Sequence, residues 1–289
     1  MAIGTKGDQY TKEILQRILD EGCMDENPRP KYSDGTPAHT ISVNHGMCTY
    51  DLTKGESPLI TLRPIAVKKS IGELLWIYKD ESNNLERLKE YGVTWWDEWD
   101  IEDRTIGAVY GETVRRHRLV EDLIKGLREN PDGRRHIISL WQVEDFKDKH
   151  GLKPCAFLTM WNVRHGKNEK GEKTDYLDMC LVQRSSDFLT AGCINQVQYV
   201  IFQHMIARHL GMTPGRFTWF YNNIQIYDRH IEQAKEIIKR EPIDCNPQIV
   251  INPKKTNFYF MTPDDIEIVG YPKEKIKEKN PQMKFDIGI

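Results

Sequence analysis

The chain has 289 residues, of which 39% are hydrophobic and 29% charged, and its 41 basic and 43 acidic side chains give a formal net charge of −2. This composition excludes an intrinsically disordered chain and a broadly basic nucleic-acid surface, but it allows a local group of arginines that binds a small anion. No apolar run approaches the roughly 18 residues of a membrane-spanning helix, and the first residues lack the apolar stretch of a signal peptide. We therefore expect a globular protein of the cytoplasm.

Helices are predicted mainly in the first half of the chain. Apolar residues recur at helical spacing over 10–19, with Gly22 following as a cap, and again over 65–78 and 119–127. The third pattern stops at an Asn-Pro-Asp-Gly turn at 130–133, a typical breaker of regular structure.

The second half of the chain changes its periodicity from helical to strand-like. Segments rich in β-branched and aromatic residues predict strands at 136–143, 155–163, 176–183, 217–227, 248–251, 258–261 and 266–269. A buried helix is expected over 194–205, an amphipathic helix over 231–238, and a solvated loop over 166–175. Helices and strands are mixed rather than alternating, and no linker or repeat interrupts them. This favours a single α+β domain over residues 1–289, with a mixed β-sheet and surrounding helices.

Metal and nucleotide-loop motifs were tested and set aside. Residues 166–174 resemble a phosphate-binding loop, but Glu172 interrupts the required Gly-Lys-Ser/Thr run. His204 and His209 share a predicted helix at a spacing of five, whereas two helical imidazoles share a metal at a spacing of four. No metal site is predicted.

The cysteines are six in number, far apart, and without a Cys-x-x-Cys pair, which excludes a zinc ribbon and a redox dithiol. We expect reduced thiols, and Cys155 is the candidate for reactivity. It follows Pro154 at the start of a predicted strand, with Arg134 and Arg135 upstream and Arg184 at the end of the next strand. If the strands gather these arginines, they lower the pKa of the thiol and form a phosphate clamp. The alternative is an inert, buried cysteine.

Three tryptophans, Trp95, Trp96 and Trp99, lie within five residues of one another. They are either ordinary core residues or the wall of a pocket for a flat heterocycle, because indole faces stack well on planar rings.

A series of motifs along the chain resembles the thymidylate synthase family. The motifs are Asp-Gly-Thr-Pro-Ala-His-Thr at 34–40, Glu-Leu-Leu-Trp at 73–76, Trp-Asp-Glu-Trp at 96–99, Gly-Ala-Val-Tyr-Gly at 107–111, Arg-Arg-His-Ile at 134–137, Pro-Cys at 154–155, Gln-Arg-Ser-Ser-Asp at 183–187, Asn195 and Tyr227. The resemblance covers nearly the whole chain and extends to its last residue, Ile289. It implies an obligate homodimer with sheets stacked back to back, in which Arg134 and Arg135 are donated across the interface.

The resemblance also implies an activity in nucleotide biosynthesis. It is the reductive methylation of dUMP to dTMP, with 5,10-methylenetetrahydrofolate as one-carbon and hydride donor and no metal. Cys155 adds to C6 of the pyrimidine, which makes C5 nucleophilic. The alternative within the fold is a dUMP or dCMP hydroxymethylase, in which water replaces the hydride. An alternative of another class is a catalytically silent protein that uses the pocket to bind RNA.

Roles for individual residues follow from the same resemblance. The implied catalytic residues are Cys155, Glu73, Tyr110, Asn195 and Asp187. The implied nucleotide-binding residues are Arg134, Arg135, Gln183, Arg184, Ser185, Asn195, Gln225 and Tyr227. The implied folate-binding residues are Arg63, Trp96, Trp99, Asp187 and Ile289. An amide at Asn195 suits the N3–H and O4 of uracil, whereas a carboxylate there favours cytosine.

The chain departs from the family pattern at four places. Gln225 stands in place of a sugar-contacting histidine, and Ala156 in place of a histidine after the nucleophile. The segment 190–194 reads Thr-Ala-Gly-Cys-Ile where the family usually has Leu-Gly-x-Pro-Phe. The N-terminal loop lacks the family's phosphate-binding arginine, for which Arg29 or Lys31 is the candidate substitute.

Overall fold

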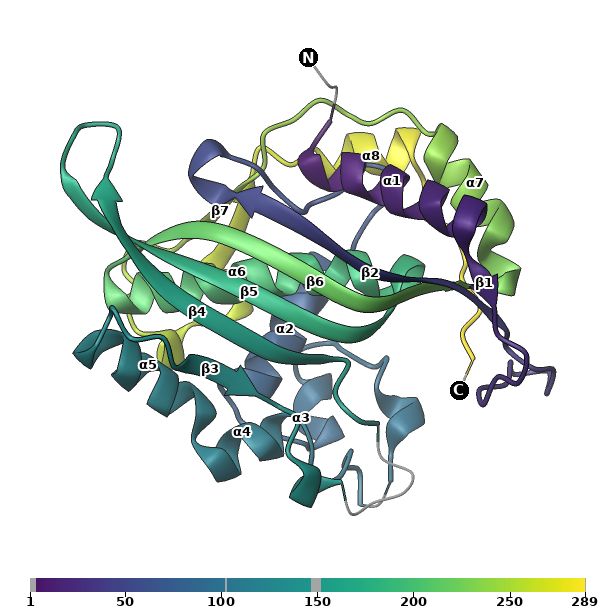
Figure 1. Ribbon diagram of the computed structural model, residues 1–289, viewed down its shortest axis with the longest axis horizontal. Helices are drawn as coiled ribbons and strands as arrows, with labels where there is room; N and C mark the ends of the chain where they lie inside the picture. The colour runs from purple at the N-terminus through teal and green to yellow at the C-terminus, as the bar shows by residue number, and fades with distance from the viewer. Residues whose placement is uncertain (1–3, 102, 147–151, 289) are drawn as a thin grey trace.

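The computed structural model describes residues 4–101, 103–146 and 152–288, and a six-stranded mixed sheet runs through it (Figure 1). Its order is β1-β2-β6-β5-β4-β3, with β5 and β6 parallel and the other neighbours antiparallel. The strands are β1 (Cys23–Met24), β2 (Thr40–Asp51), β3 (His136–Ser139), β4 (Ala156–Lys167), β5 (Lys173–Asp187) and β6 (Thr213–Tyr227). A separate pair, β7 (Gln248–Ile251) and β8 (Ile266–Val269), is antiparallel.

Helices cover one face of the sheet, and α6 and α2 lie behind it in the view of Figure 1. The helices are α1 (Lys6–Glu21), α2 (Val67–Tyr78), α3 (Leu85–Lys89), α4 (Gly111–His117), α5 (Leu119–Glu129), α6 (Cys193–Leu210), α7 (Ile231–Lys239) and α8 (Lys273–Lys279). The core between α6 and the sheet is aromatic, with Trp161, Phe202 and Trp219 fully buried. Because α6 is covered nearly all round, polar groups on it must find partners within the protein.

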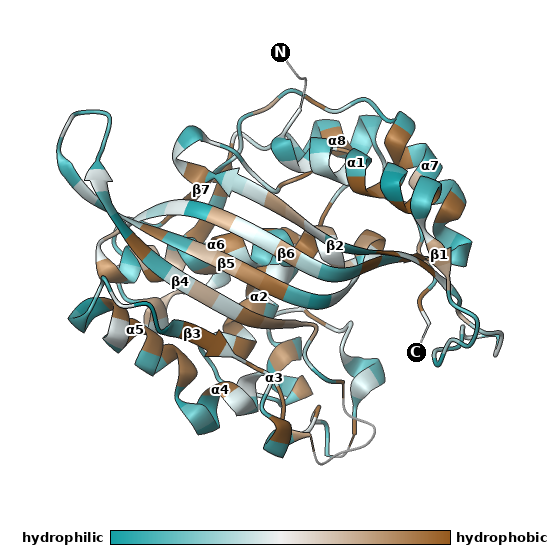
Figure 2. Cartoon of the chain, viewed as in Figure 1, coloured by the Kyte–Doolittle hydropathy of each residue, from teal (hydrophilic) through white to brown (hydrophobic). Residues whose placement is uncertain are grey.

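The other face of the sheet carries exposed and half-exposed apolar side chains. Ile137, Met160 and Cys180 stand side by side across β3, β4 and β5. A second row runs across four strands through Leu158, Val182, Phe220 and Met47. Met47 is 67% exposed and Ile137 46%, and Figure 2 shows apolar residues along this part of the sheet. We call this set of residues the open face.

The predicted α+β class and mixed sheet are confirmed, with several local differences, one of which is that the strand predicted over 136–143 ends at Ser139. The strand predicted over 258–261 is wrong, because Asn257 caps a 3₁₀ turn at Phe258–Phe260 and Phe258 is buried against Phe202. Half of the loop predicted over 166–175 is strand, since β4 extends to Lys167 and β5 begins at Lys173. The strand β2 was not predicted, because its polar centre (44–46), which includes His45 at φ 55°, hides the alternation.

Among the described residues, no helix is long and apolar enough to cross a membrane, and no group of three or more His, Cys, Asp and Glu side chains is arranged to hold a metal ion. Nδ1 of His204 instead donates to the carbonyl of Val200 in its own helix at 2.8 Å, and burial lowers the pKa of His204 to about 4.

Candidate active site

Cys155 lies immediately before β4, and Arg184 of β5 is fixed beside it. The backbone N–H of Arg184 donates to the carbonyl of Cys155 at 2.9 Å. The guanidinium donates from Nε to the carbonyl of Pro154 at 2.9 Å and from Nη2 to that of Lys153 at 2.8 Å, which leaves Nη2 3.6 Å from Sγ of Cys155. The guanidinium also lies over the ring of Trp141. The cation next to the thiol is therefore held at several points.

The thiol of Cys155 has a raised pKa in the single chain. Burial raises it, the charge of Arg184 lowers it in part, and Asp187 adds to the rise. The predicted net lowering is thus wrong for the chain by itself, because only one of the expected arginine groups is near the sulfur.

Arg134 and Arg135 are not brought to Cys155 within one chain. They precede His136, which pairs with Trp161 of β4, whereas Cys155 lies at the opposite end of that strand. Both arginines are exposed, and they line a hollow of about 350 Å³ with residues 130–136 of the same turn. In the part of the chain that is described, neither guanidinium has a hydrogen-bonding or ionic partner. They are free to bind a group outside their own subunit.

A chain of buried amides links the sheet to Glu73. The indole N–H of Trp219 donates to Oε1 of Gln183 at 2.9 Å, and Nε2 of Gln183 donates to Oδ1 of Asn195 at 3.1 Å. Nδ2 of Asn195 lies 3.5 Å from Oε1 of Gln198, whose Nε2 donates to Oε2 of Glu73 at 2.9 Å. We call these five residues the amide chain.

The amide chain has a single polarity. An indole only donates and a carboxylate only accepts, so the two ends determine which way each amide between them is turned. Asn195 is thereby held with its oxygen toward Gln183 and its nitrogen toward Gln198. A second N–H of Asn195 and a second lone pair of its oxygen remain for a ligand.

Glu73 is a buried carboxyl on α2 that receives several donors. Its Oε1 accepts from the indole N–H groups of Trp96 and Trp95, the latter at 3.3 Å. Burial raises its pKa, and hydrogen bonds from Trp96, Gln198 and Trp95 oppose the rise. A buried carboxyl with a raised pKa is suited to acid–base work.

Each of the two predicted roles, core residue and pocket wall, applies to part of the tryptophan group. Trp96 is buried among Trp76, Trp99 and Tyr110, with the Tyr110 ring edge-on at 5.0 Å, and its N–H serves Glu73. Trp99 is only partly buried, so part of its ring faces outward.

Tyr110 joins this group to Cys155. Its hydroxyl accepts a hydrogen bond from the backbone N–H of Cys155 at 3.3 Å. Its backbone has φ 53° and ψ −111°, a conformation that is costly for a tyrosine. At the next position a Cβ on Gly111 would lie 2.1 Å from the carbonyl oxygen of Ser82, so only glycine fits. The strained turn places the hydroxyl beside Cys155.

Asp187 ends β5 on the other side of the site. Burial raises its pKa to about 7, against hydrogen bonding from Thr190 and the charge of Arg63. Its Oδ1 is buried without a hydrogen-bond partner, and so is Oγ of Ser186 next to it. Orphaned buried polar atoms are costly, so both suit a ligand that supplies the missing partner.

Arg63, predicted to be either a folate-tail residue or an ordinary surface arginine, is buried and only 3% exposed. Its Nη2 donates to the carbonyl of Leu189 at 2.5 Å, its guanidinium lies over Phe285, and its Nε is buried without a partner. The surface alternative is therefore wrong.

The sugar-binding candidates lie on the next strand. Gln225 of β6 pairs with Asp187, and Ser185 pairs with Asn223. The hydroxyl of Tyr227 donates to the carbonyl of Gly288 at 3.2 Å, and burial raises its pKa to about 12. The charge of Arg29 acts on this tyrosine and lowers its pKa in part. Ile289 lies outside the described residues.

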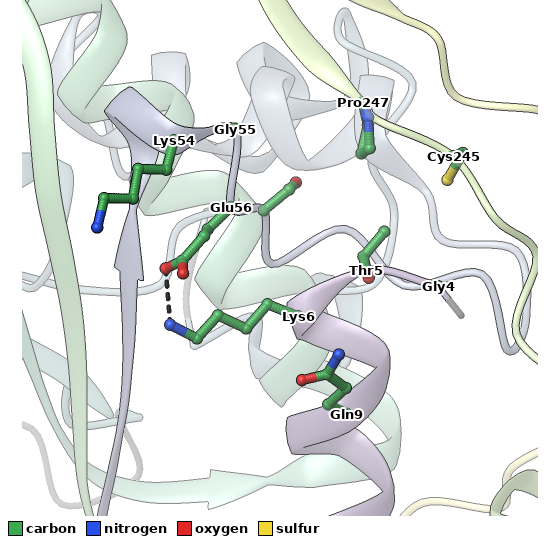
Figure 3. A pocket seen from close by; sticks show the side chains of 10 residues that line it. Gly4, Thr5, Lys6, Gln9, Lys54, Gly55, Glu56, Cys245 and Pro247 are labelled. Atoms are coloured by element: carbon green, nitrogen blue, oxygen red, sulfur yellow. Dashed lines mark hydrogen bonds and ion pairs between the residues drawn. The ribbon is translucent and has the colours of Figure 1, made fainter. Parts of the chain in front are cut away.

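A second hollow, of about 300 Å³, lies at the start of α1, lined by residues that include Lys6, Glu56 and Cys245 (Figure 3). Lys6 and Glu56 are paired at 2.6 Å. Burial raises the pKa of Cys245 to about 11, so this thiol is protonated at neutral pH. None of the predicted site residues lines this hollow. All six cysteines are unpaired, as predicted.

Gln198 is a residue of the candidate site that the sequence did not reveal. Gln198 lies three residues after Asn195, a spacing that puts both on one face of a helix. That spacing was the available signal, but a glutamine on a buried helix carries no distinctive motif.

Comparisons with known proteins agree on one family. The profile of the family described as thymidylate synthase matches residues 8–282. The thymidylate synthase of Lactococcus lactis subsp. cremoris (strain SK11) is 48% identical over 287 residues, covering 99% of this chain and 100% of that protein. That of Streptococcus pneumoniae (strain 70585) is 48% identical over 288 residues, with the same coverage. The solved structure of thermostable thymidylate synthase A from Bacillus subtilis is similar with a TM-score of 0.87 and 33% identity, covering 98% of this chain and 99% of that one.

Proposed function

This chain belongs to the thymidylate synthase family, and on that premise we propose how its residues carry out the methylation of dUMP to dTMP. The protein is a methyltransferase, and the family assignment favours the synthase over the hydroxymethylase. The observation that carries the residue assignments is the convergence of Cys155, Arg184, Tyr110 and the amide chain at one end of the sheet.

Cys155 is the nucleophile that adds to C6 of the pyrimidine. Addition puts electron density on C5 and O4, so that C5 attacks the one-carbon unit. Because the resting thiol has a raised pKa, it must lose its proton as the nucleotide binds. Glu73 and Tyr110 are the proton-handling groups: the carboxyl is buried with a raised pKa, and the hydroxyl lies beside the nucleophile's backbone. Tyr110 helps to remove the C5 proton later in the reaction.

Asn195 reads the base. In the polarity set by the amide chain, its free N–H donates to O4 of uracil and its oxygen accepts from N3–H. Cytosine presents the opposite pattern, an acceptor at N3 and a donor at N4. An unrestrained asparagine turns over to suit either base, so the fixed polarity favours dUMP. Gln183 contributes to nucleotide binding by fixing the orientation of Asn195.

Charged and hydroxyl groups hold the rest of the nucleotide. Arg184 and Ser185 bind the 5′-phosphate from their own subunit, and Arg134 and Arg135 bind it from the partner subunit. Gln225 and Tyr227 bind the deoxyribose. Arg29 is the candidate for the missing arginine of the N-terminal loop, because its charge reaches Tyr227.

The partner arginines require a homodimer, and the open face is the surface that we assign to it. Its two rows of apolar side chains run across the sheet, and two such faces stacked back to back cover each other. The dimer also gives the unpartnered Arg134 and Arg135 an anion to bind.

Methylenetetrahydrofolate supplies the one-carbon unit and the hydride. The residues present fit its pterin, because Asp187 offers a buried oxygen without a partner and Trp99, against which the buried Trp96 packs, offers ring surface. Arg63 holds the folate side of the pocket through its hydrogen bond to Leu189, and a contribution of Ile289 to folate binding stays a prediction. No metal is needed. A location in the cytoplasm stays a prediction.

A product assay tests the proposal. Purified protein is incubated with methylenetetrahydrofolate and either dUMP or dCMP, while dihydrofolate and nucleotide mass are followed together. We expect dTMP with one dihydrofolate per turnover from dUMP alone. A hydroxymethyl nucleotide with tetrahydrofolate left unoxidised would make the chain a hydroxymethylase, and turnover of dCMP would refute the role of Asn195. No turnover with RNA binding would make it the silent binding protein.

A further inference from the structure

The β4–β5 hairpin extends beyond the neighbouring strands at the end of the sheet where β3 begins (Figure 1). Its tip is a tight five-residue turn over 168–172. The side-chain oxygen of Asn168 accepts from the backbone N–H groups of Lys170 and Glu172, both at 3.0 Å. The tip of the hairpin takes no part in the site described above.

His165 of this hairpin lies between two carboxylates. Its Nδ1 is 2.7 Å from Oδ1 of Asp175 across the hairpin, and its Nε2 is 2.9 Å from Oδ1 of Asp132. Asp132 belongs to the turn between α5 and β3, two residues before Arg134. The imidazole therefore ties the hairpin to the segment that carries the arginine pair.

Hydrogen bonds at Asn130, one of them from His136 at the start of β3, also hold the turn. Nε2 of His136 donates to the carbonyl of Asn130 at 2.9 Å, and the N–H of Gly133 donates to the same carbonyl at 2.9 Å. No hydrogen bond or ion pair to a described residue holds the side chains of Arg134 and Arg135. Asp132 adds a side-chain link from the turn to the β4–β5 hairpin, beside the link from His136 of β3.

We propose that His165 is a positioning residue for nucleotide binding: it clamps the turn through Asp132 and so holds Arg134 and Arg135 ready for the phosphate in the partner subunit. This inference rests on the proposed function, which gives the two arginines that ligand. The clamp acts on the orientation of the arginines and not on the chemical step.

The clamp depends on the protonation of His165. Only the imidazolium has two N–H donors, so the neutral ring donates to one carboxylate at a time. The charged groups that act on it are Asp175 from β5 and Asp132 from the turn, and hydrogen bonds from both raise its pKa. The clamp is complete below that pKa and is lost as the pH rises through it.

The test compares the KM for dUMP of the dimeric protein and its His165→Gln variant between pH 6 and pH 9. Exposed ion pairs are weak, so we expect a rise in KM of about threefold at pH 6 with unchanged kcat, and equal KM values at pH 9. Asp132→Asn should behave like His165→Gln. Arg164→Gln is the matched control, because Arg164 pairs with Asp178 within the same hairpin and does not reach the turn; its KM should stay that of the wild type.

NMR titration of His165 supplies a readout that does not depend on activity. We expect its pKa above the ordinary value and lower in Asp132→Asn. An unchanged pKa in Asp132→Asn, or equal KM values for His165→Gln and wild type at pH 6, would overturn the clamp. An Arg135→Ala variant distinguishes a failure of the proposed function from a failure of the clamp. If this variant leaves the KM for dUMP unchanged, the proposed phosphate role of the arginines fails, whatever the result for His165. If it raises KM while His165→Gln does not, the clamp alone fails.

Discussion

The two ends of β4 and β5 are stabilised by different kinds of interaction. At the end near Cys155, most side chains are buried and many polar groups are tied to specific partners, as in the amide chain from Trp219 to Glu73. At the hairpin end, the polar groups are exposed and paired by charge, as in His165 with Asp132 and Asp175. The first end holds the chemistry, and the second holds the arginines assigned to the partner subunit.

The difference determines how each end responds to change. A buried donor left without an acceptor costs about 1–3 kcal/mol, because water cannot replace the lost partner. An exposed ion pair is weak and screened by salt, and water solvates whatever is left. The buried end therefore fixes geometry strictly, whereas the exposed end can be adjusted by pH and ionic strength.

The largest effect is expected from Cys155→Ser at the buried end. Turnover should fall at least about 10³-fold, because serine is a far weaker nucleophile at neutral pH. Binding of dUMP, measured by calorimetry, should persist because Arg184 and Asn195 are untouched. Cys245→Ser is the matched control and should keep full activity. Retained turnover in Cys155→Ser would refute the assignment of the nucleophile.

The next largest effect is expected at Arg184, the cation beside the thiol of Cys155. Arg184→Ala should weaken dUMP binding by about 2–5 kcal/mol, since it removes a fixed partner of the phosphate. Arg216→Ala, at an exposed arginine of the neighbouring strand, should leave the affinity unchanged. Calorimetry on both variants checks this, and equal affinities would show that Arg184 does not contact the nucleotide.

Asp187 makes the buried end sensitive to pH in the protein without ligands. Its pKa is raised from 3.8 to about 7, so its contribution to stability is fully present below pH 3.8 and is lost as the pH rises through 7. Asp187→Asn removes this dependence. Between pH 4 and pH 8 the wild type should lose on the order of 4 kcal/mol of unfolding free energy relative to the variant. Parallel urea titrations at both pH values measure it, and parallel pH profiles would contradict it.

Gln198 tests the polarity of the amide chain. In Gln198→Leu, Asn195 and Ser70 lose a buried partner, so the unfolding free energy should fall by about 1–3 kcal/mol. Asn195 also becomes free to turn over, so the preference for dUMP over dCMP in binding should decrease. Gln196→Leu is the matched control: that buried glutamine lies outside the amide chain, and its loss should cost stability without changing the preference. A similar preference in both variants would show that the polarity is set elsewhere.

The same contrast explains what the sequence predicts. Local patterns predict α1, α5 and the strands around Cys155, because these segments bury one clear face. The family motifs identify Arg184 and Asn195 as site residues, but not how Asn195 is oriented. That orientation depends on Gln198 and Trp219, which are far apart in sequence and ordinary in type. Likewise, the pattern at 166–175 indicates a polar loop, because an exposed hairpin has no buried face to reveal its strands.

The smallest expected effect is a different response of the two ends of β4 and β5 to salt concentration. Raising the ionic strength from about 0.1 M to 1 M shortens the screening length from roughly 10 Å to 3 Å. The difference in KM of about threefold expected between wild type and His165→Gln at pH 6 should then disappear, because the clamp consists of exposed charges. The loss of dUMP preference in Gln198→Leu should remain, since its hydrogen bonds are buried. Steady-state kinetics and binding at both salt concentrations measure the two differences side by side. If the His165 difference persisted in 1 M salt, the imidazole would act through packing rather than through its charge.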